Sequence, residues 1–450
     1  MTLLGQADQL GRLVGLYGCM AILRDKIGQT KPYSFLSIKT IESMKHHLSI
    51  SIKMGSAISR ENPVNVPKTP SRPPSPPRNN EFSSVRHYNA RSRQMRPRNT
   101  ADVDNHTMGI SLLEYLEIKV HQAVLERAYR EIIVHGVYCR YSSESIPFDG
   151  EKRDKPFNWE RPTARVEGDT LYIECFPGYD HIEHYAEIIA NYLKLREKQG
   201  DSLTPSSRVS YIPVSCSDIQ TALHATNIDQ FPGNKVDTVI LGLVWHLPRL
   251  TGSTEWSGNG PWQWILKPFN GRLVAFLGFR PAFWGDISGE VIYKLAASFQ
   301  IKQVIYLGKL GGLKPEVVPN EWLATGSQSL VNNRMVKWKN VLAPSVEHCG
   351  KDSVIVGMHI TLGSVLHETR SWHSELVDEV DFVDPEIGMM AQAAVRSGIQ
   401  YGYLHMITDN LGRKYDEDLS NERKESVLRR RQRLHQQVEY IIEDHLMRDS

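Results

Sequence analysis

The stretch VIYLGKLGGLKP (residues 304–315) decides how this sequence is expected to fold. It begins with a short aliphatic run and continues into a segment that contains Gly308, Gly311 and Gly312. A strand that is apolar on both faces is typical of a sheet that helices cover on both sides. Glycines at its end let backbone amides approach a ligand closely, because no side chain intervenes. Glycines also follow strands for purely steric reasons, so alone they are a weak sign of a ligand site.

Comparable aliphatic runs lie on both sides of this stretch: VDTVILGLV (236–244), RLVAFLGF (272–279), DSVIVGMHI (352–360) and YGYLHMIT (401–408). Helical segments such as SGEVIYKLAASF and EIGMMAQAAVRSG separate them. This alternation predicts an α/β fold with three layers, in which a largely parallel or mixed sheet carries helices on both faces. A ligand would then bind beyond the carboxyl ends of the strands.

The preceding part of the chain predicts a helical or α+β region. Apolar residues recur at three to four positions between residues 110 and 137, which predicts one long amphipathic helix. The runs TLYIECF, HIEHYAEIIANYLKLREK and RVSYIPV follow as strand, helix and strand. They indicate an α/β unit between about residues 165 and 215.

Residues 60–99 differ in composition from the rest of the chain, because they are rich in Pro, Ser and Arg and poor in aliphatic residues. Such a segment is expected to be a disordered linker. It carries nine Lys or Arg against two Glu, so RNA is a possible partner, although charged runs are more often simply solvated. The expected division is 1–59 with no assigned role, 60–105 as linker, 106–232 as accessory region and 233–450 as the α/β domain.

Composition excludes several classes of protein. A chain of 450 residues with a formal charge of +2 is not wholly devoted to nucleic acid. Its five cysteines are scattered without a CxxC pair, which argues against a disulfide framework and a zinc site, so no metal is expected. A reducing, cytoplasmic location follows as an expectation. No apolar run reaches the roughly 18 residues of a membrane-spanning helix.

Two acidic stretches follow apolar runs. In DFVDPEIGMM (381–390), Asp384 and Glu386 flank a proline at the start of a predicted helix, where acids commonly cap the helix. A carboxylate there can also accept hydrogen bonds from two neighbouring sugar hydroxyls. In HMITDNLG, Asp409 directly follows a predicted strand, where a general acid or base would be expected, or a turn cap.

In this order, these stretches resemble the purine nucleoside phosphorylase and nucleosidase superfamily over about residues 235–445. The resemblance rests on the opening strand VDTVILGLV, the loop and helix GFRPAFWGDISGEVIYKLAASF, the cluster GKLGGL, the acidic triplet in VDPEIGMMAQAA, and the pair Thr408 and Asp409. It implies a phosphorylase-like domain at 233–450, a nucleoside substrate, no cofactor, phosphate as a possible co-substrate, and self-association into a homo-oligomer.

The resemblance also implies roles for particular residues. Glu386, with Asp384 beside it, would bind the ribose hydroxyls, and Asp409 would protonate the departing purine. Gly308, Gly311 and Gly312 would line the base. Thr361 would donate a hydroxyl group, Arg280 would bind phosphate, and His246 would act as a base.

The sequence departs from the family at several of these places. His246, beside Trp245, stands near the position of a water-activating glutamate, and a lone histidine there is more often structural. Pro385 replaces a methionine, and Gly363 and Val365 stand where an aspartate and an aromatic residue are usual. Three functions therefore stay open: an enzyme that cleaves or transfers at the N-glycosidic bond of a purine nucleoside or derivative, a non-catalytic nucleoside sensor, and an RNA-dependent transferase or synthase.

Three further patterns are expected to be structural or remain open. His181 and His184 in HIEHY are too few for a metal site and are expected on an exposed helix face. The tryptophans of STEWSGNGPWQWILKP form either a lid or a packed insertion. The last predicted helix should dock an apolar face on the sheet and leave the arginines between 429 and 433 in solvent.

Overall fold

The computed structural model describes residues 94–98, 102–140, 142–252, 255–415 and 424–448. These residues lie within one compact unit of the chain. The predicted segment 1–59 and most of the predicted linker, 60–105, fall outside the described residues, so both remain predictions.

The first part of the described chain forms a small sheet of four strands. Its strand order is β2-β3-β1-β4, with β2 antiparallel to β3 and the other pairs parallel. Helix α5 packs against this sheet through an apolar stripe that includes Ile182 and Ile189, because both lie in the same buried cluster as the strands. The bounds are β1 Glu131–His135, β2 Thr163–Glu167, β3 Thr170–Glu174, α5 Tyr179–Lys198 and β4 Val209–Tyr211.

The single long helix predicted over residues 110–137 is wrong. The structure has α3 (Ser111–Lys119) and α4 (Ala123–Glu126), and then the chain enters β1. The run Ile132 to Val134 is β-branched throughout and fully or almost fully buried, with strands paired on both sides. Such residues favour a strand once a sheet is available, and helical spacing alone does not reveal that sheet.

The larger sheet contains eleven strands among the described residues. Strand β8 is its centre: it runs parallel to β15 over its whole length, parallel to β5 in its first half, and antiparallel to β14 at its end. The sheet is therefore mixed. The bounds are β5 Thr238–Gly242, β6 Trp262–Phe269, β7 Arg272–Phe279, β8 Gln303–Gly312, β9 Leu323–Thr325, β10 Gln328–Val331, β11 Arg334–Lys337, β12 Val354–Val356, β13 His359–Thr361, β14 Phe382–Asp384 and β15 Gln400–Asn410.

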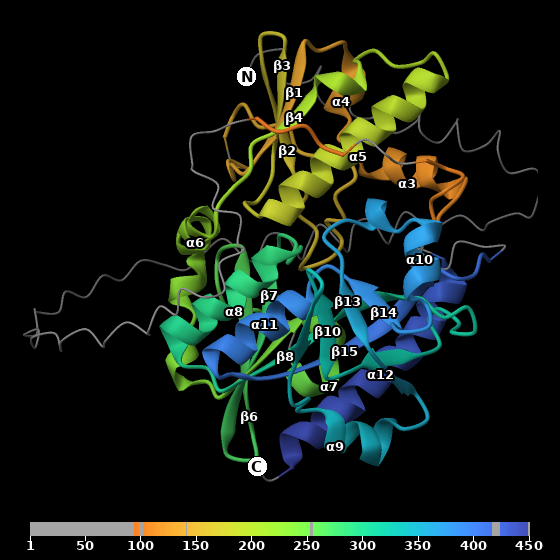
Figure 1. Ribbon diagram of the computed structural model, residues 1–450. Helices are drawn as coiled ribbons and strands as arrows, with labels where there is room; N and C mark the ends of the chain where they lie inside the picture. Colours follow the sequence, from red (N-terminus) through yellow and green to blue (C-terminus); the bar gives the residue numbers. More distant parts are fainter. Residues whose placement is uncertain (1–93, 99–101, 141, 253–254, 416–423, 449–450) are drawn as a thin grey trace, which may run out of the picture. The chain divides into compact units, whose positions relative to one another are not determined.

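Helices cover both faces of the larger sheet (Figure 1). Helices α8 and α11 share a buried cluster with Tyr306 and Tyr401, whereas α12 shares another with Ile305 and Leu404. Neighbouring residues of one strand point to opposite faces, so the two clusters are the two sides of the sheet. The remaining helices are α6 Cys216–His224, α7 Pro248–Thr251, α8 Asp286–Phe299, α9 Ala343–Ser345, α10 Arg370–Leu376, α11 Ile387–Ser397 and α12 Glu425–Met447.

The predicted fold class is confirmed, because helices flank a mixed sheet on both faces and an α+β region precedes it. The tryptophan-rich stretch is packed: Trp262 lies in β6, is fully buried and stacks on Phe279 at 4.1 Å. In the part of the chain that the structure describes, no helix has the length and apolar character to cross a membrane.

Candidate functional site

Strand register brings the predicted glycines and Asp409 to one end of β8. Asp409 lies opposite Gly311 across the β8–β15 pair, and Val383 lies opposite Gly311 on the other side. A bulge between Ile407 and Asp409 shifts the register at this point. A Cβ atom on Gly311 would lie 3.0 Å from the Asp409 Oδ2 atom, so the glycine leaves room for this carboxyl group.

Asp409 is an accessible acid in a desolvated setting. Its side chain reaches solvent, yet the surrounding protein desolvates the carboxyl group and raises its pKa. A hydrogen bond from the Thr408 hydroxyl group, at 3.2 Å, and the charges of Arg431 and Lys309 oppose this shift. Burial and the charge of Asp409 also raise the pKa of Glu368 well above its usual range. Two acids whose pKa values are raised by burial are therefore electrostatically coupled near the end of β15.

Asp384 is the capping residue of α11. Its Oδ1 atom accepts the backbone N–H groups of Glu386 and Ile387, each at 2.9 Å. Burial acts to raise the pKa of Asp384, but His359, whose Nε2 atom lies 3.1 Å from Oδ1, and the backbone donors hold it below the usual range. Asp384 is thus an ionised carboxylate held inside the protein.

Glu386 stands at the start of α11 and differs electrostatically from Asp384. Burial, followed by the charge of Asp384, raises the pKa of Glu386 well above its usual range. Its backbone carbonyl accepts a hydrogen bond from the Ser288 hydroxyl group of α8 at 3.1 Å. The side chain remains partly accessible, so it is available to a ligand.

Thr361 connects β13 to α11. Its Oγ1 atom accepts the Gly388 N–H group at 3.0 Å and lies 3.3 Å from the Ser329 hydroxyl oxygen. Gly308 has a packing role, because a Cβ atom there would lie 2.3 Å from the Nε2 atom of buried His405. Burial lowers the pKa of His405 to about 3, so this ring is neutral.

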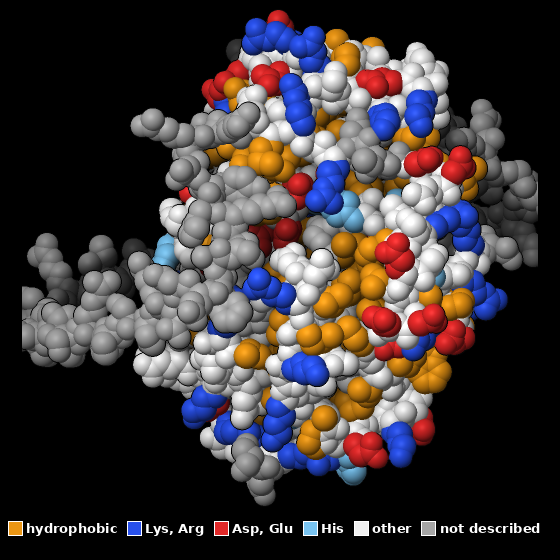
Figure 2. Space-filling view, in the orientation of Figure 1, with side chains coloured by type: hydrophobic (Ala, Val, Ile, Leu, Met, Phe, Trp, Pro, Cys, Tyr) orange, Lys and Arg blue, Asp and Glu red, His pale blue; other side chains and the backbone are white. Residues whose placement is uncertain are grey.

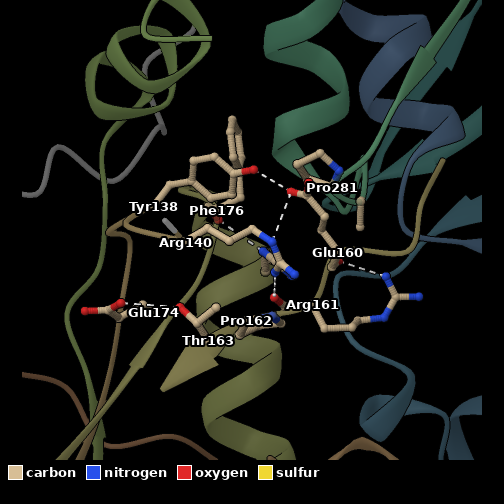
Figure 3. Close-up of a pocket in the computed structure, with 11 residues that line it drawn as sticks. Tyr138, Arg140, Glu160, Arg161, Pro162, Thr163, Glu174, Phe176 and Pro281 are labelled. Atoms are coloured by element: carbon tan, nitrogen blue, oxygen red, sulfur yellow. Dashed lines mark hydrogen bonds and ion pairs between the residues drawn. The ribbon is translucent and has the colours of Figure 1, made fainter. Parts of the chain in front are cut away.

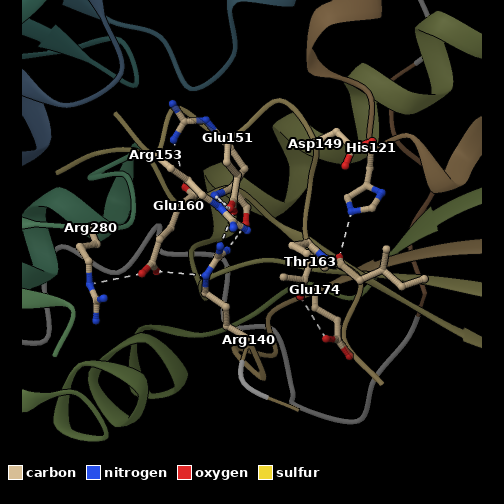
Figure 4. Close-up of polar contacts among 12 residues, drawn as sticks. His121, Arg140, Asp149, Glu151, Arg153, Glu160, Thr163, Glu174 and Arg280 are labelled. Carbon is tan, nitrogen blue, oxygen red and sulfur yellow. Dashed lines mark hydrogen bonds and ion pairs between the residues drawn. The ribbon is translucent and has the colours of Figure 1, made fainter. Parts of the chain in front are cut away.

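Arg280 is engaged by an acid of the accessory region. Its Nε atom lies 3.4 Å from the Oε1 atom of Glu160, whose side chain is almost fully buried. Glu160 also accepts a hydrogen bond from the Tyr138 hydroxyl group (Figure 3). It faces Arg140 as well as Arg280 (Figure 4). An anion at Arg280 would have to compete with this carboxylate.

The same acid borders a small cavity (Figure 3). Its volume is about 10 Å³, which is the room of one water molecule. Its lining includes Tyr138, Glu160, Phe176 and Pro281, so it lies away from Glu386 and Asp409. A nucleoside cannot enter a space of this size.

His246 faces α12. Its ring stacks on His435 with 3.9 Å between ring centroids and 19° between planes. Burial, then the charges of His246 and Lys309, lowers the pKa of His435 to about 3. Because Lys309 also influences Asp409, His246 lies on the α12 side of the same sheet edge, whereas Glu386 lies on the α8 side.

A carboxyl pair that the sequence did not reveal joins the accessory region to the larger sheet. Asp286 begins α8, and its two oxygens accept the N–H groups of Tyr179 and Asp180 at 2.9 and 3.2 Å. Asp180, in turn, accepts the Asp286 N–H group at 3.1 Å. Desolvation by burial, with the neighbouring negative charge, raises the pKa of Asp180 to about 8. Desolvation also raises that of Asp286 to about 6.

Histidines of α5 extend this interface. The expected exposed position of His181 and His184 is wrong, because both are buried. The His184 Nδ1 atom lies 2.8 Å from the Ser364 hydroxyl oxygen, and its ring stacks on Trp284 at 4.3 Å. The partners of His184, Trp284 and Ser364, are 100 or more residues away in the chain, so the local pattern HIEHY carries no sign of them.

The segment 361–368 lies beside Asp180 of the α5–α8 junction and contains Glu368, which is influenced by Asp409. A Cβ atom on Gly363 would lie 3.1 Å from the Asp180 carboxyl group, while Glu368 responds to the charge of Asp409. On the other side, the Ser288 hydroxyl group bridges Gly285 and Glu386. These contacts tie Glu386 to α8 and Gly363 to Asp180.

Side chains of both charges are interspersed with apolar ones over the described residues on the face seen in Figure 2. The basic linker that motivated RNA as a partner lies mostly outside the described residues. In the last helix, Arg429 is exposed as expected, but Arg431 is buried and donates to the Asn320 side chain at 2.7 Å. The expected docking of this helix is confirmed by its buried apolar face, which comprises Val427, Leu434, Val438, Ile441 and Leu446.

Comparisons with known proteins yield relatives of limited similarity. No family model matches the chain. A curated relative, oxidoreductase cns1 of Cordyceps militaris, is 26% identical over 245 residues. The match covers 47% of this chain and 30% of that protein, so the chain spans less than a third of the length of this relative.

Solved structures similar to this chain are nucleosidases and nucleoside phosphorylases. A 5'-methylthioadenosine/S-adenosylhomocysteine nucleosidase of Campylobacter jejuni is 13% identical, with 46% of this chain and 99% of that chain covered at a TM-score of 0.39. A purine nucleoside phosphorylase of Toxoplasma gondii is 11% identical, with 49% and 94% covered at a TM-score of 0.41. These solved structures fall in the superfamily that the sequence motifs resemble. At TM-scores below 0.5 the likeness carries no activity over to this chain.

Proposed function

We propose that the protein cleaves or transfers at the N-glycosidic bond of a purine nucleoside or derivative, with Asp409 as the general acid. The observation that supports this most is the raised pKa of an accessible carboxyl group at the carboxyl end of a central strand. A purine leaves poorly as an anion, and a carboxylic acid with a raised pKa is better suited to hold a proton and transfer it to the base as the bond breaks.

In this proposal Glu386 binds the ribose. It is partly accessible at the start of α11, and its backbone is held by Asp384 and Ser288. A carboxyl group held in this way can hydrogen-bond two adjacent hydroxyl groups. Asp384 keeps the start of α11 in position and does not itself contact the sugar.

The attacking group is the open part of the reaction. Arg280 has the neighbouring carboxylate of Glu160, which disfavours a phosphate ion at this guanidinium group. We therefore favour water as the attacking group over phosphate. Its candidate base, His246, stacks on α12 and would have to act across the edge of the sheet, because Glu386 contacts α8. Thr361 already accepts an amide hydrogen bond, and the Ser329 hydroxyl oxygen at 3.3 Å competes with a ligand oxygen for its hydroxyl hydrogen.

The direct test is to incubate the purified chain with adenosine, inosine, guanosine and methylthioadenosine, each with and without phosphate. Release of free base is expected from at least one, with little dependence on phosphate. Glu386→Gln should lose more activity on the ribonucleoside than on its 2'-deoxy analogue, because the clamp acts on hydroxyl groups. Absence of free base from all four compounds would contradict the proposal.

A nucleoside sensor without turnover is the second candidate. It is favoured by the accessory region, because Asp180 lies against Gly363 and Trp284 donates to the Gly363 carbonyl oxygen at 2.8 Å. Such contacts could report ligand binding to the rest of the chain. Calorimetry separates the two candidates, since heat of binding without product supports the sensor.

A further inference from the structure

A histidine, a cysteine and an aspartate meet on the α12 side of the larger sheet, away from Glu386. His348 and Cys349 are consecutive in a π-helical turn, Val346–Gly350, and Asp444 projects from α12. One ligand atom from each of the three residues lies within 4.8 Å of the others. The three are 96 residues apart in the chain at most, so only the packing of this turn on α12 brings them together.

The ligand types favour a borderline-soft divalent cation. Thiolate sulfur and imidazole nitrogen together suit Zn²⁺, and a carboxylate oxygen completes many such sets. In a tetrahedral zinc site, bond lengths of about 2.0 to 2.3 Å imply ligand atoms separated by roughly 3.3 to 3.8 Å. The observed spread of up to 4.8 Å therefore closes with small side-chain rotations, without movement of the helices.

Neighbouring groups hold the ligands in position. The Oδ2 atom of Asp444 is paired with the Nε atom of Arg448 at 2.6 Å. Its Oδ1 atom lies 2.9 Å from the Nδ1 atom of His348, and the Cys349 thiol donates to the Ser345 carbonyl oxygen at 3.1 Å, so a bound cation would replace both of these contacts. The Gln437 amide donates to the Cys349 carbonyl oxygen at 2.7 Å, which holds the backbone of the turn. Groups of this kind orient metal ligands and commonly affect affinity by about 10- to 100-fold.

Access to the three residues is open. The His348 side chain is 67% exposed. Cys349 and Asp444 line a surface pocket of about 400 Å³, together with Tyr440 and Glu443. A cation could enter from solvent, and the pocket leaves room for a fourth ligand such as water.

We propose that His348, Cys349 and Asp444 form a binding site for a zinc-class divalent cation, which ties the π-helical turn to α12 and keeps one position open toward the pocket. This site shares no residue with the proposed glycosidic-bond chemistry, because none of its three ligands is Glu386, Asp409 or His246. Cysteine deprotonates on binding, so the metal releases a proton at neutral pH.

The experiment uses the whole chain, stripped of metal, and titrates it with Co²⁺ and then with Zn²⁺. One Co²⁺ per chain is expected, with a thiolate-to-cobalt charge-transfer absorption that Zn²⁺ displaces. Cys349→Ser should remove that absorption, and His348→Ala should weaken Co²⁺ binding at least about tenfold. Cys139→Ser is the matched control, because Cys139 is an exposed cysteine outside the cluster.

A second readout does not depend on either variant folding normally. Zn²⁺ should slow the alkylation of Cys349 in the unaltered protein while leaving that of Cys139 unchanged, as measured by mass spectrometry of the peptides. If Zn²⁺ leaves Cys349 alkylation unchanged, or if the cobalt absorption is the same in Cys349→Ser, the proposed site does not exist.

Discussion

The end of β8 and the junction of α5 with α8 carry acids of raised pKa for different reasons. At the end of β8, Asp409 lies near the end of β15 and faces Gly311, which pairs with Val383 of β14 on its other side. At the α5–α8 junction, Asp180 and Asp286 start two helices and each caps the helix of the other. The position of Asp409 can be recognised from a local sequence pattern, whereas the pairing of Asp180 with Asp286 depends on how two helices that are remote in the chain pack together.

This difference separates a group that can react from a group that holds parts together. Asp409 accepts a hydrogen bond from the Thr408 hydroxyl group, and it reaches solvent. The oxygens of Asp180 and Asp286 instead accept backbone N–H groups at helix starts. A carboxyl group engaged by backbone donors positions the fold, while an accessible one can give its proton to a ligand.

The largest expected effect comes from Asp409→Asn. If this residue is the general acid, the rate on a purine nucleoside should fall by about 10²- to 10⁴-fold, because the base must then leave unprotonated. A riboside with an activated leaving group, such as nitrophenol, should be cleaved by the variant almost as fast as by the original protein. The measurement is kcat for both substrates.

Asp378→Asn is the control for this substitution, since Asp378 is an exposed acid after α10. It should leave both rates unchanged. Equal losses on the purine and on the activated riboside would assign Asp409 a structural role instead.

His246→Asn should have the next largest effect. A base that activates water contributes about 10²-fold or more, and a phosphate ion needs no such base. Hydrolysis should therefore fall about 100-fold, while any phosphate-dependent cleavage is unaffected. The measurement is the rate of base release by the variant with and without phosphate. Unchanged hydrolysis would mean that His246 only stacks on His435 and does not activate water.

Much of the larger sheet could be predicted from the sequence, because its central strands are continuous aliphatic runs. The predicted runs 272–279 and 401–408 match β7 and most of β15. The run 352–360 instead divides into β12 and β13, since Gly357 packs against the Asp381 carboxyl group, where a Cβ atom would lie 2.5 Å from an oxygen. A contact with a residue this far along the chain has no local signature.

The candidate site was predictable only in part for the same reason. Capping by Asp384 follows from an acid before a helix, and the structure bears out this local expectation. The partner of Arg280 was not predictable, because Glu160 belongs to the accessory region and meets it only after folding. The buried position of Arg431 likewise depends on Asn320, more than 100 residues away.

The α5–α8 junction should make stability depend on pH. The pKa of Asp180 is raised to about 8 in the folded chain, above its ordinary value, so folding binds a proton. The stabilisation is fully present below the unfolded pKa and is lost as pH rises toward about 8. The free energy of unfolding should therefore fall between about pH 5 and pH 8, by up to about 1.4 kcal/mol for each pH unit.

Asp180→Asn is the matched variant for this pH dependence, because its amide oxygen can still accept the Asp286 N–H group. The variant should show a clearly smaller loss of stability between the two pH values in denaturant titrations. If the free energy of unfolding falls with pH as steeply in the variant as in the original protein, a group other than Asp180 binds the proton on folding.

The smallest expected effect is that of His184→Ala, which tests whether α5 is held by side chains as well as by helix caps. The substitution removes the stacking on Trp284 and the contact with the Ser364 hydroxyl group. A stacked pair contributes about 0.5 to 1.5 kcal/mol and a hydrogen bond about 1 kcal/mol, so unfolding should become easier by roughly 2 kcal/mol.

His224→Ala gives the comparison for that value. His224 is exposed and pairs with Asp229 at 3.1 Å, and a surface pair of this kind contributes about 0 to 1 kcal/mol. Chemical denaturation of both variants, followed by tryptophan fluorescence, measures the difference. If the two substitutions cost the same, the α5–α8 junction depends on the reciprocal caps of Asp180 and Asp286 alone. The sequence pattern HIEHY would then contribute apolar surface and no specific contact, because burial of the ring without its partners gains little beyond its area.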